Sequence, residues 1–227
     1  MSRVTRDDKY YMTLVTLQVE DCLFRVPRHT LVSQSKFFRE MFLVPPPKGS
    51  EPEGTSDEHP ICVQGIKKGD FKRLMKVLFA SPLSWGNMQP PPVFEEWFPV
   101  IQLSKLWEFD DVHKFAIHEV PYASVQKEPA EKVALAFQYD IEPWLLPALN
   151  ELAQRPEPIN KDDVELLGLE VALKVAAVRE SLTVAQNSDR YNPLRIVAGS
   201  RDAGRVDFSS RIKEIFKMSG LSGPMFF

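Results

Sequence analysis

Residues 15–42 read VTLQVEDCLFRVPRHTLVSQSKFFREMF, a pattern that predicts two strands followed by two helical segments. Apolar and polar residues alternate over Val15–Val19 and Leu23–Val26, as in strands, and Glu20-Asp21 between them predicts the turn of a hairpin. Pro27 ends the second strand and can open a helix, because it has no N–H group to leave unbonded in a first turn. The residues that follow give the helical segments an apolar face; they are Leu31, Phe37, Phe38, Met41 and Phe42.

Helical patterns and proline-rich segments alternate in the next part of the chain. Ile61–Gln64 is a short third strand, in which Cys62 is expected to face inward. Asp70–Ala80 and Phe94–Trp107 have the apolar spacing of helices. A further helix is predicted to run through His118, with Asp110 or Asp111 as its N-cap. Two segments are predicted loops: Pro45–Asp57 and Ser81–Pro92.

From Pro129 onward the pattern is purely helical, with apolar segments around residues 133–137, 144–152 and 171–178. Asn160 is a candidate N-cap, with Asp162 and Asp163 in the first turn, where the helix dipole favours carboxylates. Residues 187–205 are polar and predict a linker, and Asp207–Met218 predicts a last amphipathic helix capped by Asp207. The fold class is therefore α+β, with a small three-stranded sheet capped by a helical cluster and an all-α extension after it.

Composition narrows the classes of protein to consider. The 227 residues carry a net charge of −3, which argues against a basic face that binds nucleic acid directly. Two cysteines are too few for a disulfide framework, so we expect an intracellular protein, cytoplasmic or nuclear. The polar first eight residues do not resemble a secretory signal, and no apolar run is long enough to span a membrane.

Few residues have the spacing that catalysis or metal binding needs. Cys22, His29, His59 and Cys62 form the one Cys/His set worth testing, and it lacks the close pairs of a structural zinc site. The sequence contains no phosphate-binding glycine loop and no nucleophile elbow. The acidic pairs lie near predicted helix starts, where capping explains them without chemistry; they are Glu95-Glu96, Asp110-Asp111 and Asp162-Asp163. We therefore expect no catalytic, cofactor or metal site and no enzyme, with a hydrolase or metal enzyme as the least supported hypothesis.

Three segments together resemble the BTB/POZ family, and in particular a fungal subgroup of it: Pro27–Phe42 after the hairpin, Leu103–Val112, and Tyr139–Leu149. The segment Glu53–Ile61 before the third strand is also similar to that subgroup. The similarity covers roughly residues 10–182, about one to two ordinary domains. It implies a BTB/POZ domain over residues 1–122 (core about 10–120), a BACK-like helical extension over 123–186, and a linker with a C-terminal helix over 187–227. It also implies a module that binds proteins and mediates homo- or hetero-oligomerisation.

The resemblance implies that the first strand and the first helices pair with a second copy or with another BTB protein. Leu14 stands where many members have an acidic residue, and Arg28 matches the basic residue that normally faces it. The acidic half of that charged pocket is therefore replaced by an apolar side chain. The candidate interface residues are Tyr10, Tyr11, Met12, Leu14, Phe37 and Met41.

An alternative within the same class of binding proteins is a substrate adaptor of a cullin-type ubiquitin ligase. In such adaptors the helices matched here by Asp70–Ala80 and Phe94–Trp107 face the cullin scaffold. The candidate cullin-facing residues are Phe71, Phe79 and Trp97. No kelch-like repeat and no zinc finger follows, so a role in transcription would have to come through a partner.

Overall fold

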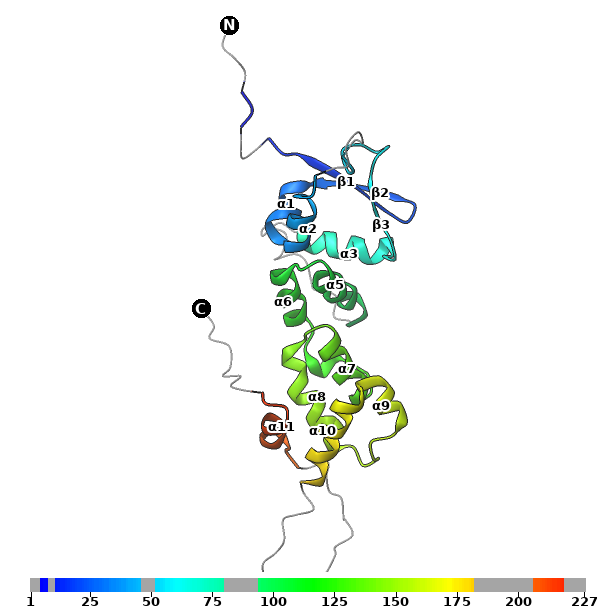
Figure 1. Ribbon diagram of the computed structural model, residues 1–227, viewed down its shortest axis with the longest axis vertical. Coiled ribbons are helices and arrows are strands. Elements are labelled where there is room, and N and C mark those ends of the chain that lie inside the picture. The colour runs from blue at the N-terminus through cyan, green and yellow to red at the C-terminus, as the bar shows by residue number, and fades with distance from the viewer. Residues whose placement is uncertain (1–4, 8–10, 46–51, 80–93, 182–205, 219–227) are drawn as a thin grey trace, which may run out of the picture. The chain divides into compact units, whose positions relative to one another are not determined.

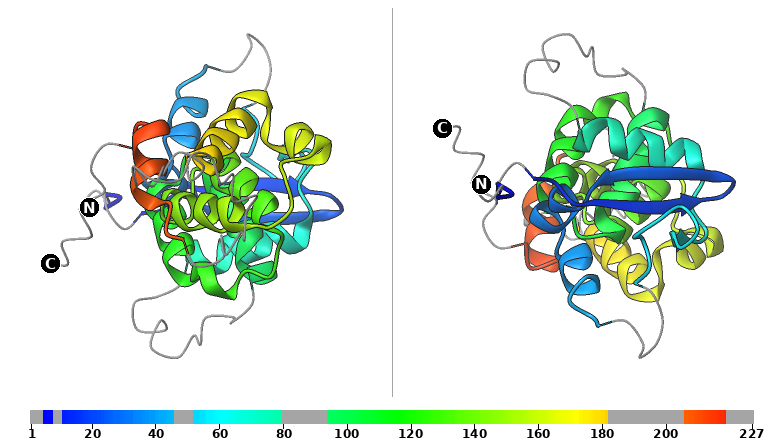
Figure 2. Two further views of the ribbon diagram at one scale, coloured as in Figure 1. Left: turned by 90° about the horizontal axis from the view of Figure 1, so that it is seen from below. Right: turned by 90° about the horizontal axis from the view of Figure 1, so that it is seen from above.

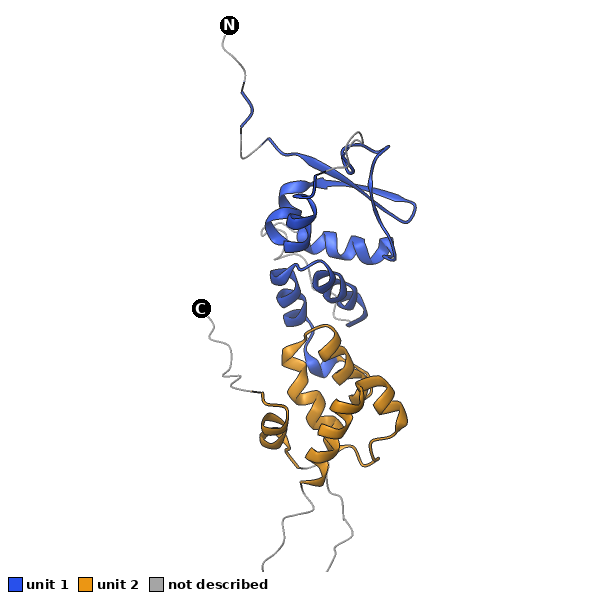
Figure 3. Ribbon diagram, in the orientation of Figure 1, with its two compact units in different colours: residues 1–124 blue, residues 125–227 orange. Residues whose placement is uncertain are grey.

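The computed structural model describes residues 5–7, 11–45, 52–79, 94–181 and 206–218. The chain divides into two compact units, residues 1–124 and residues 125–227 (Figure 3). The predicted loop Ser81–Pro92 and the predicted linker 187–205 lie outside the described residues. Within the described part, no helix has both the length and the apolar content that crossing a lipid bilayer requires.

Unit 1 is built on a small mixed sheet. β1 (Leu14–Val19) pairs antiparallel with β2 (Cys22–Pro27) and parallel with β3 (Ile61–Val63), in the order β2-β1-β3. β1 and β2 run side by side as one ribbon in all the views (Figures 1 and 2). The predicted hairpin and third strand are confirmed, and Glu20 takes the left-handed conformation in the turn, with a φ of 54°.

β1 is buried more completely than an alternating strand would be. Val15 and Leu17 are buried, as alternation allows, but Thr16 between them is also fully buried. The loop before β3 covers it: the Thr16 N–H group donates to the Gly54 carbonyl oxygen at 2.9 Å, and Thr16 Oγ1 donates to Asp57 at 3.4 Å. Gly54 has a φ of 81°, and a Cβ atom there would lie 2.6 Å from a Val15 methyl group, so this position needs glycine.

Helices complete unit 1. The hairpin leads into α1 (Arg28–Gln34) and α2 (Lys36–Met41), and α3 (Lys68–Leu78) follows β3. α5 (Phe94–Leu106), α6 (Asp110–Glu119) and the short 3-10 helix η1 (Tyr122–Ser124) close the unit. The core beneath the sheet is aromatic, with edge-on or tilted rings 4.7 to 5.9 Å apart: Phe24, Phe38, Phe71, Trp107 and Phe109.

The start of α6 differs from the prediction. Phe109 occupies the N-cap position and has no side-chain cap bond, whereas Asp110 and Asp111 lie in the first turn. The burial of Phe109, which is fully enclosed, fixes where the chain enters the helix. The two carboxylates still lie near the positive end of the helix dipole, but they do not cap it.

Unit 2 is all helical. It contains α7 (Pro129–Gln138), α8 (Glu142–Gln154), α9 (Lys161–Leu167), α10 (Leu169–Glu180) and α11 (Ser209–Ile215). α8 packs against α7, α10 and α11, and its Trp144 and Leu152 are fully buried. The coarse expectation of an α+β fold with a helical extension is thus confirmed.

The last helix is attached through polar side chains of α8. Asn150 accepts a hydrogen bond from the Phe208 N–H group at 2.8 Å, and Gln154 donates to the Val206 carbonyl oxygen at 2.7 Å. Phe208, rather than Asp207, occupies the N-cap position of α11. Hydrogen bonds from the Ser209 side chain and from the Ser209 N–H group lower the pKa of the Asp207 carboxyl group instead.

Candidate protein-binding surface

Large apolar side chains are exposed where the chain enters β1. Tyr11 and Met12 are 57% and 59% exposed, and Leu14 at the start of the strand is also exposed. Isolated apolar residues are common on protein surfaces, but a group of them marks a candidate binding site. Leu43 and Val44, which follow α2, are more exposed still.

Backbone and side-chain contacts bring these two segments together. The Arg28 N–H group donates to the Thr13 carbonyl oxygen at 2.9 Å, which holds residues 11–13 against the start of α1. The Arg28 guanidinium group lies 4.4 Å above the Phe42 ring centre and donates to the Phe42 carbonyl oxygen at 3.3 Å. Arg28 therefore links the approach to β1 with the end of α2, and α1 and α2 lie beside that end of the strand (Figure 1).

A shallow depression of about 370 Å³ lies between these segments. We call it the Arg28–Arg39 depression. Tyr11, Met12 and Leu43 supply apolar lining, and Arg28 and Arg39 supply two guanidinium groups. The described residues that line it include no Asp or Glu. The full lining is Tyr11, Met12, Thr13, Pro27, Arg28, His29, Thr30, Val32, Arg39, Phe42 and Leu43.

The structure unites only part of the predicted interface. Tyr11 and Met12 both line the depression, whereas Leu14, Phe37 and Met41 do not. Phe37 is exposed on α2 beside Phe38, and Met41 is half-buried. Tyr10 lies outside the described residues. Sequence reasoning missed Leu43 and Val44, although two apolar residues just beyond the Met-Phe end of a helix are a signal that could have identified them.

Two of the three predicted cullin-facing residues belong to the core. Phe71 is 0% exposed and its ring packs against Phe24 and Trp107. Trp97 is 4% exposed and packs edge-on against Phe115. Neither side chain can reach a partner, because the helical apolar spacing that singled them out reflects packing within unit 1. Phe79, at the end of α3, is exposed.

The Cys/His set does not converge. Among the described residues, no group of three or more His, Cys, Asp or Glu side chains is close enough together to hold a metal ion. Cys62 is exposed on β3, not inward as predicted, because the short strand turns Ile61 and Val63 toward the body instead. Its thiol lies 3.8 Å from the Gln18 amide oxygen on the neighbouring strand.

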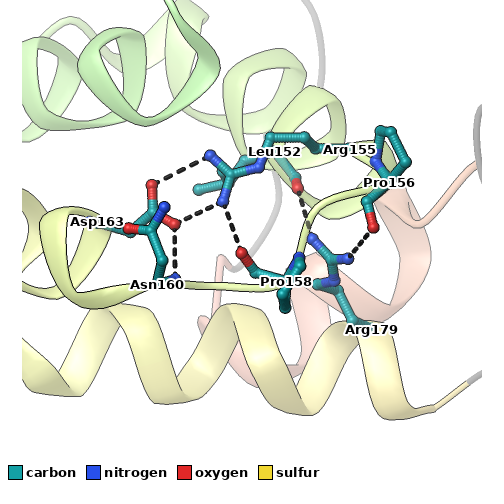
Figure 4. A network of polar contacts seen from close by, with 7 residues as sticks. All are labelled: Leu152, Arg155, Pro156, Pro158, Asn160, Asp163 and Arg179. Atoms are coloured by element: carbon teal, nitrogen blue, oxygen red, sulfur yellow. Dashed lines mark hydrogen bonds and ion pairs between the residues drawn. The ribbon is translucent and has the colours of Figure 1, made fainter.

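Helix capping and ion pairing explain Asp163 and Glu96, which belong to the acidic pairs that the sequence singles out, and Asp163 is the clearer case. Asn160 and Asp163 form a reciprocal capping box at the start of α9, with both hydrogen bonds at 2.9 Å. The buried Asp163 carboxylate also accepts hydrogen bonds from both terminal nitrogens of Arg155, and Arg155 donates another to the Pro158 carbonyl oxygen (Figure 4). The Arg155 guanidinium group lowers the pKa of Asp163. This network fixes the turn between α8 and α9, which is a structural role.

The carboxylate of Glu96, in the first turn of α5, is held in a similar way. It accepts two hydrogen bonds of 3.2 Å from Arg73 on α3, and these bonds lower its pKa. Its pKa therefore moves away from the neutral range that a general acid or base needs.

A scan against models of protein families and a search of curated proteins each found no match to this chain.

Proposed function

We propose that this chain is a protein-interaction module of the BTB/POZ type, which associates with a second copy or with another BTB protein through the entry to β1 and the end of α2. The observation that carries the proposal is the pair Tyr11 and Met12, more than half exposed beside Leu43. Fully burying a large apolar side chain is worth about 1.5–3 kcal/mol, so covering several of them supports stable association.

The order of elements in unit 1 supports the family assignment. A hairpin, two helices, a third strand and a further helical cluster follow one another, as the resemblance implies. The purely helical unit 2 supports a BACK-like extension. Leu14 supports a more apolar contact than the charged pocket common in the family, because its exposed side chain offers no acid to Arg28.

The proposal is tested by the mass of the full chain in solution. Light scattering after size exclusion at micromolar concentration is expected to give a dimer or larger species for the wild type. The double variant Met12→Lys/Leu14→Lys is expected to be monomeric, because association would bury two ammonium groups beside Arg28 and Arg39 with no acid among the described residues of the depression to pair with them. Leu166→Lys is the matched control, since Leu166 on α9 is 48% exposed against 43% for Leu14. A monomeric wild type would remove the self-association proposal.

One observation supports the cullin adaptor as a second candidate. Phe79 is 39% exposed at the end of α3, where an aromatic side chain could anchor in a pocket of a scaffold. The test is a pull-down of purified cullin by the full chain. Phe79→Ala should abolish capture, and Leu173→Ala, at an exposed position on α10, should not. Failure of the wild type to capture cullin would eliminate this candidate.

A further inference from the structure

The charge of the Arg28–Arg39 depression is opposite in sign to that of the whole chain. The chain carries a net charge of −3, yet the depression presents Arg28 and Arg39 with no Asp or Glu among the described residues that line it. A local surplus of positive charge within an acidic protein favours a partner of the opposite sign at this place.

Both guanidinium groups are oriented by bonds that do not neutralise them. Arg28 donates from Nη2 to the Phe42 carbonyl oxygen, and Arg39 donates from Nε to the Val32 carbonyl oxygen at 3.2 Å. Main-chain carbonyl groups carry no net charge, so each arginine keeps its positive charge. Terminal N–H groups remain on both guanidinium groups, and such planar donors match a carboxylate.

The apolar lining narrows the kind of partner. Tyr11, Met12 and Leu43 line the same depression as the two arginines and are exposed to solvent. A free anion or a sugar–phosphate backbone would leave this apolar surface uncovered. A peptide that carries acidic side chains next to leucine or phenylalanine would satisfy both the charged and the apolar parts.

We infer that the Arg28–Arg39 depression docks an acidic, hydrophobic peptide segment of a partner protein, with its carboxylates on Arg28 and Arg39 and its apolar side chains against Tyr11, Met12 and Leu43. This inference rests on the proposed function, because it names the partner chemistry of the same surface. It goes beyond that function, because a partner of this kind need not be another copy of the chain.

The test uses the full chain and a fluorescein-labelled peptide of sequence Gly-Asp-Glu-Leu-Phe-Asp-Glu-Gly with blocked ends. Fluorescence anisotropy is expected to show saturable binding that weakens as salt is added. Arg39→Gln is expected to weaken binding about fivefold, the upper end of what one exposed ion pair contributes. Arg39→Lys should recover part of the affinity, because it restores the charge but not the planar pair of donors.

The matched control is Arg25→Gln, since Arg25 is an exposed arginine on β2 outside the depression. Two further peptides test the charged and the apolar contacts separately. One has lysine in place of each acid, and the other has serine in place of leucine and phenylalanine. Both are expected to bind weakly. The inference is overturned if the acidic peptide shows no saturable binding, if Arg25→Gln and Arg39→Gln weaken it equally, or if an oligonucleotide of equal charge binds more tightly.

Light scattering on the same samples separates this inference from the proposed function. A monomeric chain that binds the peptide would remove self-association and keep the docking site. A dimer that does not bind the peptide would keep the self-association proposal and remove the docking site. Arg28 is not the first variant to use, because its contact with Phe42 also holds the end of α2.

Discussion

The Ser35 hydroxyl group donates a 2.5 Å hydrogen bond to the main-chain carbonyl oxygen of Trp107, 72 positions further along the chain. The Ser35 Oγ atom itself accepts a hydrogen bond from the Phe38 N–H group at 3.0 Å and so caps α2. Ser35 is fully buried. One hydroxyl group therefore joins the start of α2 to the end of α5, and it positions the helix that leads into the Arg28–Arg39 depression.

Replacing this hydroxyl group should destabilise unit 1. Ser35→Ala removes an N-cap and leaves a buried carbonyl oxygen unsatisfied, so we expect the free energy of unfolding to fall by about 2–3 kcal/mol. Urea denaturation followed by circular dichroism measures this change. Ser33→Ala is the control, because Ser33 is exposed and bonds only within α1. Equal losses in the two variants would show that the link to Trp107 contributes nothing.

Gly54→Ala should destabilise the sheet through a clash as well as through strain. A left-handed conformation alone costs an ordinary residue roughly 1–2 kcal/mol. At Gly54 the added methyl group would also meet Val15 at 2.6 Å and Ile61 at 2.9 Å. Gly65→Ala isolates the strain, because Gly65 has a φ of 75° and nothing within 4 Å of its Cβ position. A greater loss at Gly54 in denaturation experiments is expected, and a loss no larger than at Gly65 would contradict the close approach.

The Asp163–Arg155 pair should make the stability of unit 2 depend on pH. Hydrogen bonds from Arg155 hold the pKa of Asp163 below its ordinary value of 3.8. The contribution is therefore fully present above that value and is lost as the pH falls through the lower pKa of the folded state. Asp163→Ala is expected to lower the free energy of unfolding by about 3 kcal/mol near neutral pH, since it leaves a largely buried guanidinium group unpaired.

The difference in stability between wild type and Asp163→Ala should shrink as the pH falls below the ordinary pKa. Comparing the two proteins removes the slope that other carboxylates contribute. Asp162→Ala serves as the control, because Asp162 is exposed in the same helical turn. A gap between wild type and Asp163→Ala that stays constant with pH would mean that the ion pair does not carry the effect.

Glu20 should act as a cap supplied by a distant element. α3 has no side-chain cap of its own, but the Lys68 N–H group in its first turn donates to a Glu20 carboxylate oxygen at 3.0 Å. Glu20→Ala is expected to lower the free energy of unfolding by about 1 kcal/mol, the usual value for a lost N-cap. Asp21→Ala removes only an exposed ion pair with Lys68 and should change little. A larger loss at Asp21 in thermal unfolding would reverse this assignment.

Local signals in the sequence predicted much of the fold. The hairpin follows from alternation over Val15–Val26, and the capping box at Asn160 follows from one polar residue before a helical run. Each signal spans only a few neighbouring residues, so it is visible without knowledge of the tertiary structure. Tyr11 and Met12 are interface candidates by the resemblance alone, and both are exposed.

What the sequence could not reveal depends on contacts between distant residues. Phe71 and Trp97 have the spacing of a helical face, but only the packed core decides that this face is internal. The sequence predicts Asp110 or Asp111 as the N-cap of α6, but Phe109 occupies that position, because its burial outweighs the capping preference of the aspartates. The depression likewise requires Thr13, Arg28 and Phe42 to meet, and no short-range pattern encodes that meeting.

β2 forms an outer edge of the described sheet, and it carries Arg25 and Pro27. A charge and a proline at an open edge discourage the addition of foreign strands. When many copies crowd together, growth into fibrils is therefore disfavoured at this edge. In the proposed assembly, contact would be left to the side chains at the approach to β1, next to Pro27, which would give a defined number of copies and not an open-ended aggregate.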